Sequence, residues 1–504
     1  MNPVMLLRAT REAEFKMKRR ILFVALQNSP HVARWIDLVA DMDCDLHVFG
    51  VDQAAPNEKL RGVTLHWPIL SAKLRQLKSS NHNVVTEPSV PSTSVFRRIA
   101  RFSRLTLRNP GQAVRRLTVH TTRFRQHAKS WARLPRFLGR FRTQKSMASA
   151  DAKQPAGPVK VHRFQPSLSE LGGADAVSSG SVRLGESDCA APVLNGPGVL
   201  AHVVRRLQPD LIHSMEFQHA GYLVLQTREL YGGDFPTWLA TNWGSDIFYF
   251  GRFPDHRAQI QRLLKAIDFY SCECKRDIAI ARQFGYGGPV LPNLPNSGGF
   301  DLKHVRSLRS PEPPSQRKLL MIKGYQHFAG RAMVALHVLE NFATQLKGYR
   351  IVLFSVSTEP RRRAFELKEK GVLDIEVIDL ATHDEIMSRF GQARLYMGIS
   401  ISDAISTSVL EAMAMGAFPI QTDTSCCDEW FTDGEGGFIV PPDDFDLICD
   451  RFFRALRDDN LVDRAAEINW RTVQARLDRT ILSAQAVRFY DQIFAGPQHG
   501  SQSR

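Results

Sequence analysis

The feature that most restricts the fold of this chain is a repeated alternation of short apolar runs with helical patterns. Ile21–Leu26 is fully apolar, which is typical of a buried parallel strand covered by helices on both faces. Ser29 and Pro30 follow it and can cap and open a helix, and a second short strand is expected at Leu46–Phe49. This strand–helix–strand pattern predicts a parallel sheet and places the chain in the α/β class.

The same alternation recurs in two series, which are separated by the polar, Pro-rich stretch Arg309–Arg317. The further strands that we expect are Leu211–His213, Thr237–Thr241, Phe269–Cys272, Lys318–Ile322, Arg350–Phe354, Ile375–Ile378, Ala393–Met397 and Phe418–Ile420. We therefore expect two doubly wound, Rossmann-like domains. Their expected limits are residues 21–300 and 301–480, with an extension at 1–20, a terminal segment at 481–504 and one long helix from Arg471 to Ile493.

The net charge of +15 is confined to one stretch of the 504 residues. Residues 88–150 hold 13 Arg and 2 Lys but no Asp or Glu, so the remaining 441 residues balance 51 basic against 51 acidic side chains. A neutral body argues against a nucleic-acid-binding protein. The basic run belongs to a low-order insert at about residues 79–198, whose later part is read as linker. Two interpretations stay open: Arg mixed with Phe and Trp could bind an anionic membrane surface, or the run is solvated without a partner.

The cysteines and the N-terminal residues indicate the cellular compartment in which we expect the protein. The chain has seven cysteines. Cys272 and Cys274 form a C-x-C and Cys426 adjoins Cys427, but neither pair has a second pair at zinc-site spacing. Charges stand where a signal peptide needs its apolar core, and no apolar run approaches the roughly 18 residues of a membrane span. We expect reduced thiols, no metal site and a cytoplasmic location.

The strongest candidate for a binding site is the stretch from Ser400 to Ile420, which reads as strand, polar loop, helix, glycine stop and strand. Ser406–Ser408 lie at the start of the helix, where unpaired N–H groups and the helix dipole favour a diphosphate. Glu411, one turn further on, could accept hydrogen bonds from ribose hydroxyls. Ser408 and Glu411 also match the S-x-x-E capping box, so the residues alone leave both interpretations open.

The chain resembles the retaining family 4 glycosyltransferases, which have the GT-B fold. The spacing Asp403-x7-Glu411, followed by Ala-Met-Ala-Met-Gly-Ala-Phe-Pro, resembles their E-x7-E signature. The other matching stretches are Ser29–Ile36, Pro209–His213, Thr241–Asp246 (the family's T-x-H-G-x-D loop) and Pro295–Gly299. The resemblance covers roughly residues 20–78 and 199–495. It implies an N-terminal acceptor domain and a C-terminal donor domain facing a cleft.

The resemblance also implies an activity. The donor would be a UDP- or GDP-sugar, used as a substrate with no separate cofactor. The acceptor would be a glycan or a lipid-linked molecule, and the anomeric configuration would be retained. Relatives of this kind act in cell-surface polysaccharide biosynthesis, often at the inner membrane. Peripheral association with an anionic membrane through residues 88–150 is therefore expected.

Carried over position by position, the resemblance assigns roles to individual residues. Glu411 would bind the ribose, and the backbone amides of Ser406, Thr407 and Ser408 would bind the diphosphate. Asp403 stands where the family usually has its first glutamate, near the donor sugar. Two basic residues, Lys323 and Arg331, would offset the diphosphate charge, or else are solvated surface charges.

The N-terminal domain departs from the family at Trp243, where many relatives have histidine. His213 and His219 are the candidates to replace it, although a lone histidine is more often structural. Asp246 would accept a proton from the acceptor hydroxyl or orient it, or would cap the next helix.

Several motifs are missing from the sequence. It has no G-x-G-x-x-G after the first strand, no P-loop and no suitably placed D-x-D, which predicts a transferase that needs neither a dinucleotide nor a metal ion. Two alternatives remain. One is a catalytically inactive sugar-nucleotide-binding scaffold, favoured by Trp243 and Asp403, and the other is a GT-B UDP-sugar 2-epimerase.

Overall fold

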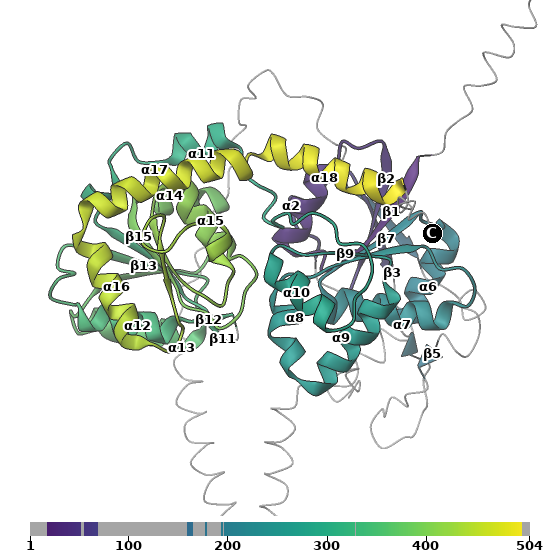
Figure 1. The fold of residues 1–504 in the computed structure, drawn as a ribbon, viewed down its shortest axis with the longest axis horizontal. Coiled ribbons are helices and arrows are strands. Elements are labelled where there is room, and N and C mark those ends of the chain that lie inside the picture. Colours follow the sequence, from purple (N-terminus) through teal and green to yellow (C-terminus); the bar gives the residue numbers. More distant parts are fainter. Residues whose placement is uncertain are drawn as a thin grey trace, which may run out of the picture. The chain divides into compact units, whose positions relative to one another are not determined.

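The protein contains two parallel β-sheets, each covered by helices on both faces, as the sequence predicts (Figure 1). The computed structural model describes residues 18–51, 55–68, 159–164, 177–178, 193–194, 196–327 and 329–495. The predicted insert at 79–198 and its basic segment 88–150 lie outside these residues, apart from the short stretches between 159 and 198. In this described part of the chain, no helix is long and apolar enough to cross a membrane.

The N-terminal sheet has seven parallel strands in the order β4-β3-β2-β1-β7-β8-β9. The strands are β1 (Arg19–Ala25), β2 (Cys44–Gly50), β3 (Thr64–Pro68), β4 (Lys160–Phe164), β7 (Leu211–Met215), β8 (Thr237–Thr241) and β9 (Phe269–Ser271). Its helices are α2 (Pro30–Val39), α6 (Gly196–Leu207), α7 (Tyr222–Tyr231), α8 (Ser245–Phe248), α9 (Pro254–Ala266) and α10 (Lys275–Gln283), with one π-helical turn, η2 (Phe217–Gly221), and one 3₁₀ turn, η3 (Phe250–Arg252). Ser29 caps α2 and Pro30 opens it, which confirms that prediction.

The C-terminal sheet has six parallel strands in the order β14-β13-β10-β15-β16-β17. The strands are β10 (Leu319–Lys323), β13 (Arg350–Phe354), β14 (Asp374–Ile378), β15 (Ala393–Gly398), β16 (Phe418–Thr422) and β17 (Phe438–Val440). The helices are α11 (Leu302–Leu308), α12 (Ala332–Asn341), α13 (Thr358–Glu369), α14 (His383–Gln392), α15 (Thr407–Met415), α16 (Phe445–Arg457), α17 (Asp459–Arg476) and α18 (Arg479–Phe494), with the 3₁₀ turns η4 (Pro314–Gln316) and η5 (Cys427–Glu429). Two small two-stranded sheets pair β11 (Gln326–His327) with β12 (Gly330–Arg331) and β5 (Val177–Ser178) with β6 (Val193–Leu194).

Two predictions about these elements are wrong. The structure places β4 inside the stretch that the sequence suggested is linker, where it pairs in parallel with β3 at the sheet edge. The single helix predicted from Arg471 to Ile493 is two helices, because α17 ends at Arg476 and Asp478 caps α18. The break lies where Phe300, from the segment between the domains, forms backbone hydrogen bonds with Leu477 and Arg479.

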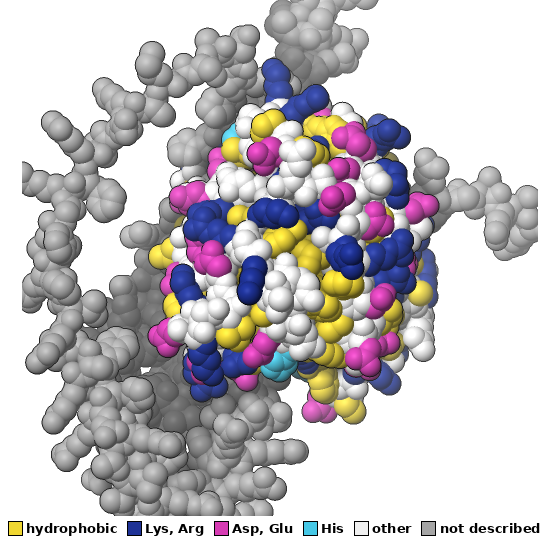
Figure 2. Space-filling view, turned by 90° about the vertical axis from the view of Figure 1, so that its left-hand side faces the viewer, with side chains coloured by type: hydrophobic (Ala, Val, Ile, Leu, Met, Phe, Trp, Pro, Cys, Tyr) yellow, Lys and Arg dark blue, Asp and Glu magenta, His cyan; other side chains and the backbone are white. Residues whose placement is uncertain are grey.

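Each strand contributes side chains to both faces of its sheet, so the core forms layers. In β1, Ile21 and Phe23 pack in one apolar cluster while Leu22 and Val24 pack in another. The first cluster also contains residues of the C-terminal sheet such as Met321, so apolar packing continues from one domain into the other. On the face of the C-terminal domain shown in Figure 2, Lys and Arg lie among Asp and Glu, in keeping with the balanced charge outside residues 88–150.

The last helix, α18, lies against α2 of the N-terminal domain through the buried hydroxyl of Tyr490. Trp35 Nε1 donates to Tyr490 Oη at 2.8 Å, and this oxygen lies 2.8 Å from Nδ1 of His213. Because the indole can only donate, the tyrosine proton is directed to Nδ1, and Nε2–H of His213 then donates to Thr241 Oγ1 at 2.7 Å. The network requires neutral His213, and burial lowers the pKa of this residue to about 3.

We expect this histidine to make folding stability depend on pH. Its pKa lies near 6.5 in the unfolded chain and about 3 in the folded one, so the unfolded chain binds one more proton between these values. The free energy of unfolding should therefore fall as the pH drops below 6.5, with a contribution from His213 approaching 1.4 kcal/mol per pH unit. His213→Gln should reduce the slope of stability against pH in urea unfolding between pH 6.5 and 4.5. An unchanged slope would contradict this assignment, whatever the variant's absolute stability.

Candidate functional site

The carboxyl ends of the parallel strands in both domains border one cavity of about 650 Å³. Ligands of α/β proteins bind at this edge, because helices begin there with N–H groups that have no intrahelical partner. The polar lining residues include Lys323, His383, Asp403, Thr407, Ser408 and Glu411 from the C-terminal domain, and His31, Arg34, Glu216, His219, Trp243 and Asp246 from the N-terminal domain. Residues far apart in the sequence thus meet at one place.

Lys323 brings a positive charge to the start of α15. It ends β10, and its ammonium group donates to Ser406 Oγ at 3.1 Å and lies 5.2 Å from the ring centre of Tyr325. Ser406 is the N-cap residue of α15 and is buried, but its side chain accepts no hydrogen bond from the helix backbone. Thr407 and Ser408, whose backbone begins the helix, line the cavity. An ammonium group and a helix N-terminus therefore act on the same space, which favours an anion.

Glu411 is buried within α15 and faces the cavity. Its Oε1 lies 2.8 Å from Nε2 of His383 and 3.9 Å from Nη2 of Arg34. The hydrogen bonds of a capping box with Ser408 do not form, because Ser406 rather than Ser408 is the N-cap residue. The capping-box interpretation of Glu411 is therefore wrong. Instead, His383 and Arg34 contact the carboxylate at the cavity wall.

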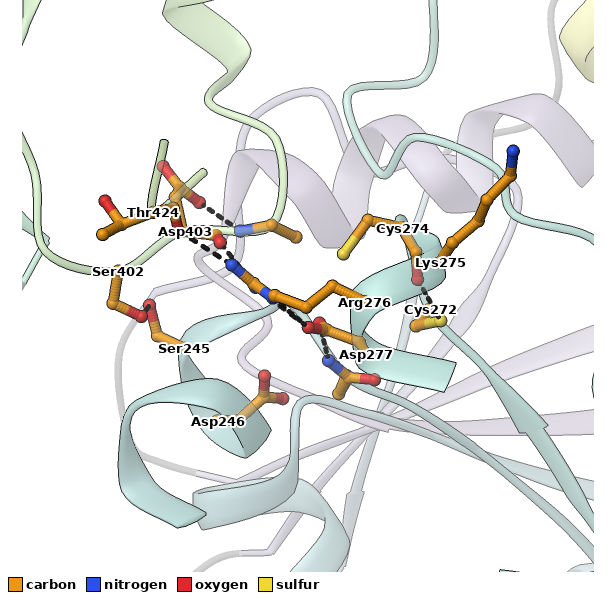
Figure 3. Close-up of polar contacts among 12 residues, drawn as sticks. Ser245, Asp246, Cys272, Cys274, Lys275, Arg276, Asp277, Ser402, Asp403 and Thr424 are labelled. Atoms are coloured by element: carbon orange, nitrogen blue, oxygen red, sulfur yellow. Dashed lines mark hydrogen bonds and ion pairs between the residues drawn. The ribbon is translucent and has the colours of Figure 1, made fainter. Parts of the chain in front are cut away.

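Asp403 lies in the loop between β15 and α15, which the N-terminal domain contacts directly (Figure 3). Arg276 donates to the backbone carbonyls of Asp403 and Thr424 at 2.7 and 2.8 Å, and to Asp277 Oδ1 at 2.9 Å. The Asp403 carboxylate accepts the amide of Ala404 at 3.0 Å. Burial raises the pKa of Asp403, and nearby Lys323 opposes this rise.

Asp246 in α8 and His219 in η2 come from neighbouring elements of the N-terminal domain. The buried carboxylate of Asp246 accepts the backbone amides of Trp243 and Phe217, at 2.8–3.2 Å. Gly244 is the N-cap residue of α8, so Asp246 is not a helix cap. Burial and the charge of Glu216 raise the pKa of Asp246 well above its usual range.

His219 is largely exposed, and its orientation depends on Glu216. Nδ1 of His219 lies 3.1 Å from Glu216 Oε2. The Glu216 carboxylate also accepts the backbone amides of Gln218 and His219, at 2.6 and 2.8 Å. Glu216 has a φ of 83°, in the left-handed region, so this turn is strained and the three hydrogen bonds stabilise it.

Three polar side chains in the cavity wall have buried atoms without a hydrogen-bond partner among the described residues. They are Nδ1 of His31, Nε1 of Trp243 and both side-chain amide atoms of Asn296. The rings of His31 and Trp243 are in contact, with centres 5.5 Å apart. Burial and nearby Arg34 lower the pKa of His31 to about 4, so its ring is neutral at pH 7. Unpaired buried polar atoms are costly, and a ligand with hydroxyl or carbonyl groups would satisfy them.

Two residues singled out from the sequence lie away from the cavity. Arg331 donates to the backbone carbonyls of His327 and Gly330 and does not line the cavity. His213 is fully buried in the Tyr490 network, which excludes it as a replacement for the family's histidine at Trp243.

Sequence reasoning missed Arg34, His31, His383, Asn296 and Glu273, all of which line the cavity. His383 opens α14 behind a capping box of Thr382 and Glu385, a signal that the sequence does contain.

Comparison with known proteins identifies the class of fold first. The structure is similar to sucrose-phosphate synthase from Thermosynechococcus elongatus, with a TM-score of 0.55, 13% identity and coverage of 95% of this chain and 100% of that one. It is also similar to HepE from Anabaena in complex with UDP, with a TM-score of 0.53, 13% identity and coverage of 94% and 100%. A glycosyltransferase from Rickettsia africae gives a TM-score of 0.51 at 12% identity, covering 95% and 100%. The two-domain architecture is therefore the GT-B fold.

Part of the sequence of the C-terminal domain matches a family model. Residues 325–458 match the family model described as Glycosyl transferases group 1. This stretch contains Asp403, α15 and Glu411, so the match supports the resemblance to a glycosyltransferase family that those residues suggested. Over these residues, which form part of the C-terminal domain, the chain is similar to the group 1 glycosyltransferases. No curated protein sequence matches the chain.

The contact between Gly244 and Ala404 tests how closely the domains approach at this site. Gly244 has a φ of +95°, and a Cβ at this position would overlap the backbone nitrogen of Ala404. Gly285 has a nearly identical φ of +98° but open space around it. We expect Gly285→Ala to lose about 1–2 kcal/mol from the backbone alone, and Gly244→Ala to lose about 1–3 kcal/mol more from the overlap.

Urea unfolding of both variants measures the difference, and small-angle X-ray scattering reports whether the Gly244→Ala chain becomes less compact. Equal destabilisation by the two substitutions would show that the domains do not meet at Gly244.

Proposed function

We propose that the chain is a retaining glycosyltransferase that moves a sugar from a UDP- or GDP-sugar to a glycan or lipid-linked acceptor. The observation that carries the proposal is the arrangement of Lys323, the N-terminus of α15 and Glu411 along one wall of the cavity. These groups match the parts of a nucleotide diphosphate in order: a cation and amides for the phosphates, then a carboxylate for the ribose. The HepE structures hold UDP and UDP-glucose, which supports UDP as the first donor nucleotide to test.

Breaking the bond between sugar and diphosphate leaves negative charge on the leaving oxygen. Lys323 and the amides of Thr407 and Ser408 would stabilise this charge as it develops. Arg34, across the cavity near Glu411, would add a second cation from the N-terminal domain. We propose that these groups replace the divalent cation that other glycosyltransferases place on the diphosphate, so that transfer is metal-independent.

Glu411 is suited to hold the ribose, because a buried carboxylate accepts hydrogen bonds from two neighbouring hydroxyls. His383 occupies Oε1 at 2.8 Å, which orients the carboxylate. The second oxygen would accept a ribose hydroxyl, while His383 and Arg34 keep the charge from being buried without a partner.

The acceptor side of the cavity would be formed by the N-terminal domain. Asp246, with its raised pKa, is a better proton acceptor than an exposed aspartate and would receive or orient the acceptor hydroxyl. His219, oriented by Glu216, would contact the same region, and Asp403 would contact hydroxyls of the donor sugar. The unpaired Nε1–H of Trp243 would donate to the donor sugar or to the acceptor, in place of the histidine that many relatives have.

We further propose that the enzyme works in the cytoplasm in cell-surface polysaccharide biosynthesis. The basic residues 88–150 would bring it to an anionic membrane, where lipid-linked acceptors are found. Nucleic acid is not expected as a partner.

The role of Lys323 can be tested against Arg331, which carries the same charge in the same domain but lies away from the cavity. A hydrogen bond to a charged group contributes about 1.5–3 kcal/mol. We therefore expect Lys323→Met to weaken UDP binding about 10- to 100-fold, and Arg331→Met to change it less than about twofold. Isothermal titration calorimetry at one fixed salt concentration measures both. Equal losses in the two variants, or none for Lys323→Met, would refute the proposed phosphate contact.

Turnover of the donor without an acceptor separates the proposal from its alternatives. A retaining transferase should slowly release UDP and a free sugar that is first formed with the donor's anomeric configuration. An epimerase would produce a second UDP-sugar and no free sugar, whereas an inactive scaffold would bind the donor unchanged. Proton NMR of the anomeric signals distinguishes all three outcomes.

Glu411→Ala, compared with the exposed Glu435→Ala, provides the matched control for this turnover. Only the first substitution should abolish donor turnover, and both variants should unfold cooperatively. Undiminished turnover in Glu411→Ala would show that the nucleotide site lies elsewhere.

A further inference from the structure

One cysteine from each of the two local pairs in the sequence meets the other between the domains. Cys274 follows β9 of the N-terminal sheet, and Cys426 follows β16 of the C-terminal sheet, so 152 positions of sequence separate them. Both are buried, with exposed fractions of 1% and 4%, and they form a small cluster with Ala404. The sequence shows only a C-x-C and a C-C, and the fold unites them.

Glu429 completes a group of three ligating side chains at this place. The two Sγ atoms and a carboxylate oxygen of Glu429 all lie within 4.8 Å of one another. Lys275 donates its backbone amide to Glu429 Oε1 at 2.7 Å, which holds the carboxylate beside the thiols. Glu429 also lines a second cavity of about 360 Å³, so an ion could reach the group from the surface.

This donor set matches the preferences of one kind of cation. Two thiolates and a carboxylate suit Zn²⁺, which forms bonds of about 2.3 Å to sulfur and 2.0 Å to oxygen. Tetrahedral angles at those lengths put the ligand atoms roughly 3.5–3.8 Å apart, so small side-chain rotations would bring all three to coordination distance. The fourth position would hold water or an added ligand. Hard cations such as Mg²⁺ are disfavoured, because they take oxygen ligands only.

We propose that Cys274, Cys426 and Glu429 bind a thiophilic divalent cation, of which Zn²⁺ is the best match, and that this ion joins the two domains. Binding displaces one proton from each thiol and involves no change of oxidation state. The site is separate from the sugar-nucleotide cavity and does not depend on the proposed transfer reaction.

An ion bound by Cys274, Cys426 and Glu429 would also affect the neighbouring loop that contains Asp403. Arg276, two residues after Cys274, contacts the backbone carbonyl of Asp403 (Figure 3). Ser425, the neighbour of Cys426, pairs with Asp403 through a backbone bridge. Both loops that would hold the ion therefore also hold the Asp403 loop, so a bound ion would stiffen the support behind that residue.

Cobalt provides a direct readout, because thiolate bonds to Co²⁺ give an intense near-ultraviolet charge-transfer band. The full-length, untagged chain is reduced with a phosphine, freed of metal with a chelator and titrated with Co²⁺, and then with Zn²⁺. We expect one Co²⁺ per chain with a thiolate band, which Zn²⁺ abolishes by displacement. Zn²⁺ should also raise the melting temperature of the wild-type chain.

Variants locate the ion. Removing a hydrogen-bond partner of a metal ligand costs about 10- to 100-fold in affinity. Loss of a thiolate ligand should cost more, so Cys274→Ser and Cys426→Ser should each weaken Zn²⁺ binding by more than about 100-fold and lose the stabilisation. Glu429→Gln should weaken binding less and keep the thiolate band. Cys427→Ser, next to Cys426 but outside the group, and Cys449→Ser in α16 are the matched controls and should behave like the wild type.

Two outcomes would overturn the proposal. The first is a thiolate band that is missing in the wild type or that persists in both Cys274→Ser and Cys426→Ser. The second is a reduced chain that binds no Zn²⁺ but, after exposure to a peroxide, yields a Cys274–Cys426 disulfide-linked peptide in mass spectrometry. That result would identify the pair as a redox site.

Discussion

The hydrogen bonds of the Tyr490 hydroxyl connect the last described helix, α18, to the N-terminal domain. The hydroxyl accepts a hydrogen bond from Trp35 in the first helix and donates to His213 in the central strand β7, while the rest of α18 buries its apolar side chains beside them. The first and last elements of the described residues, β1 and α18, therefore lie on the same domain, although the C-terminal sheet lies between them in sequence. Because the buried hydroxyl of this tyrosine both accepts and donates a hydrogen bond, it specifies one position for the last helix on the N-terminal domain. Because both domains line the cavity, the position of α18 on the N-terminal domain contributes to the shape of the site.

Local sequence patterns predicted the central strands of both sheets well and the sheet edge poorly. β1 and β10 are continuous apolar runs because helices cover both their faces, and such runs are visible in a single sequence. β4 is the edge strand, pairs with β3 and follows a long polar insert, and the short strand β3 lies between β4 and β2. The break between α17 and α18 contains neither Gly nor Pro, and its local signal is Asp478, which caps α18. Phe300, far away in sequence, forms the backbone hydrogen bonds that divide the helix.

The candidate site, too, combines residues that the sequence predicts with residues that only the fold reveals. Lys323, Asp403 and Glu411 could be found from the sequence, because Lys323 directly follows a predicted strand and the other two lie in the recognisable stretch from Ser400 to Ile420. Arg34 and His383 reach Glu411 from a different domain and a different loop, which only the assembled fold reveals. The family resemblance assigned Arg331 to the diphosphate together with Lys323, yet in the β11–β12 hairpin its side chain donates to the backbone carbonyls of His327 and Gly330. The sequence therefore indicates which charged residues lie in these stretches, but not which of their side chains point into the cavity.

The contacts between the two domains have a consequence for exchanging domains among related proteins. Arg276 reaches across to carbonyl oxygens of Asp403 and Thr424, and Gly244 abuts the backbone nitrogen of Ala404. Both interactions engage main-chain atoms of the C-terminal domain, which every sequence possesses. An N-terminal domain that carries this arginine and this glycine could therefore accept C-terminal domains with different side chains in the same loops. Chimeras that keep those two residues but vary the side chains that face the cavity would combine new pairs of donor and acceptor sites. The contacts between the two domains would not have to be redesigned.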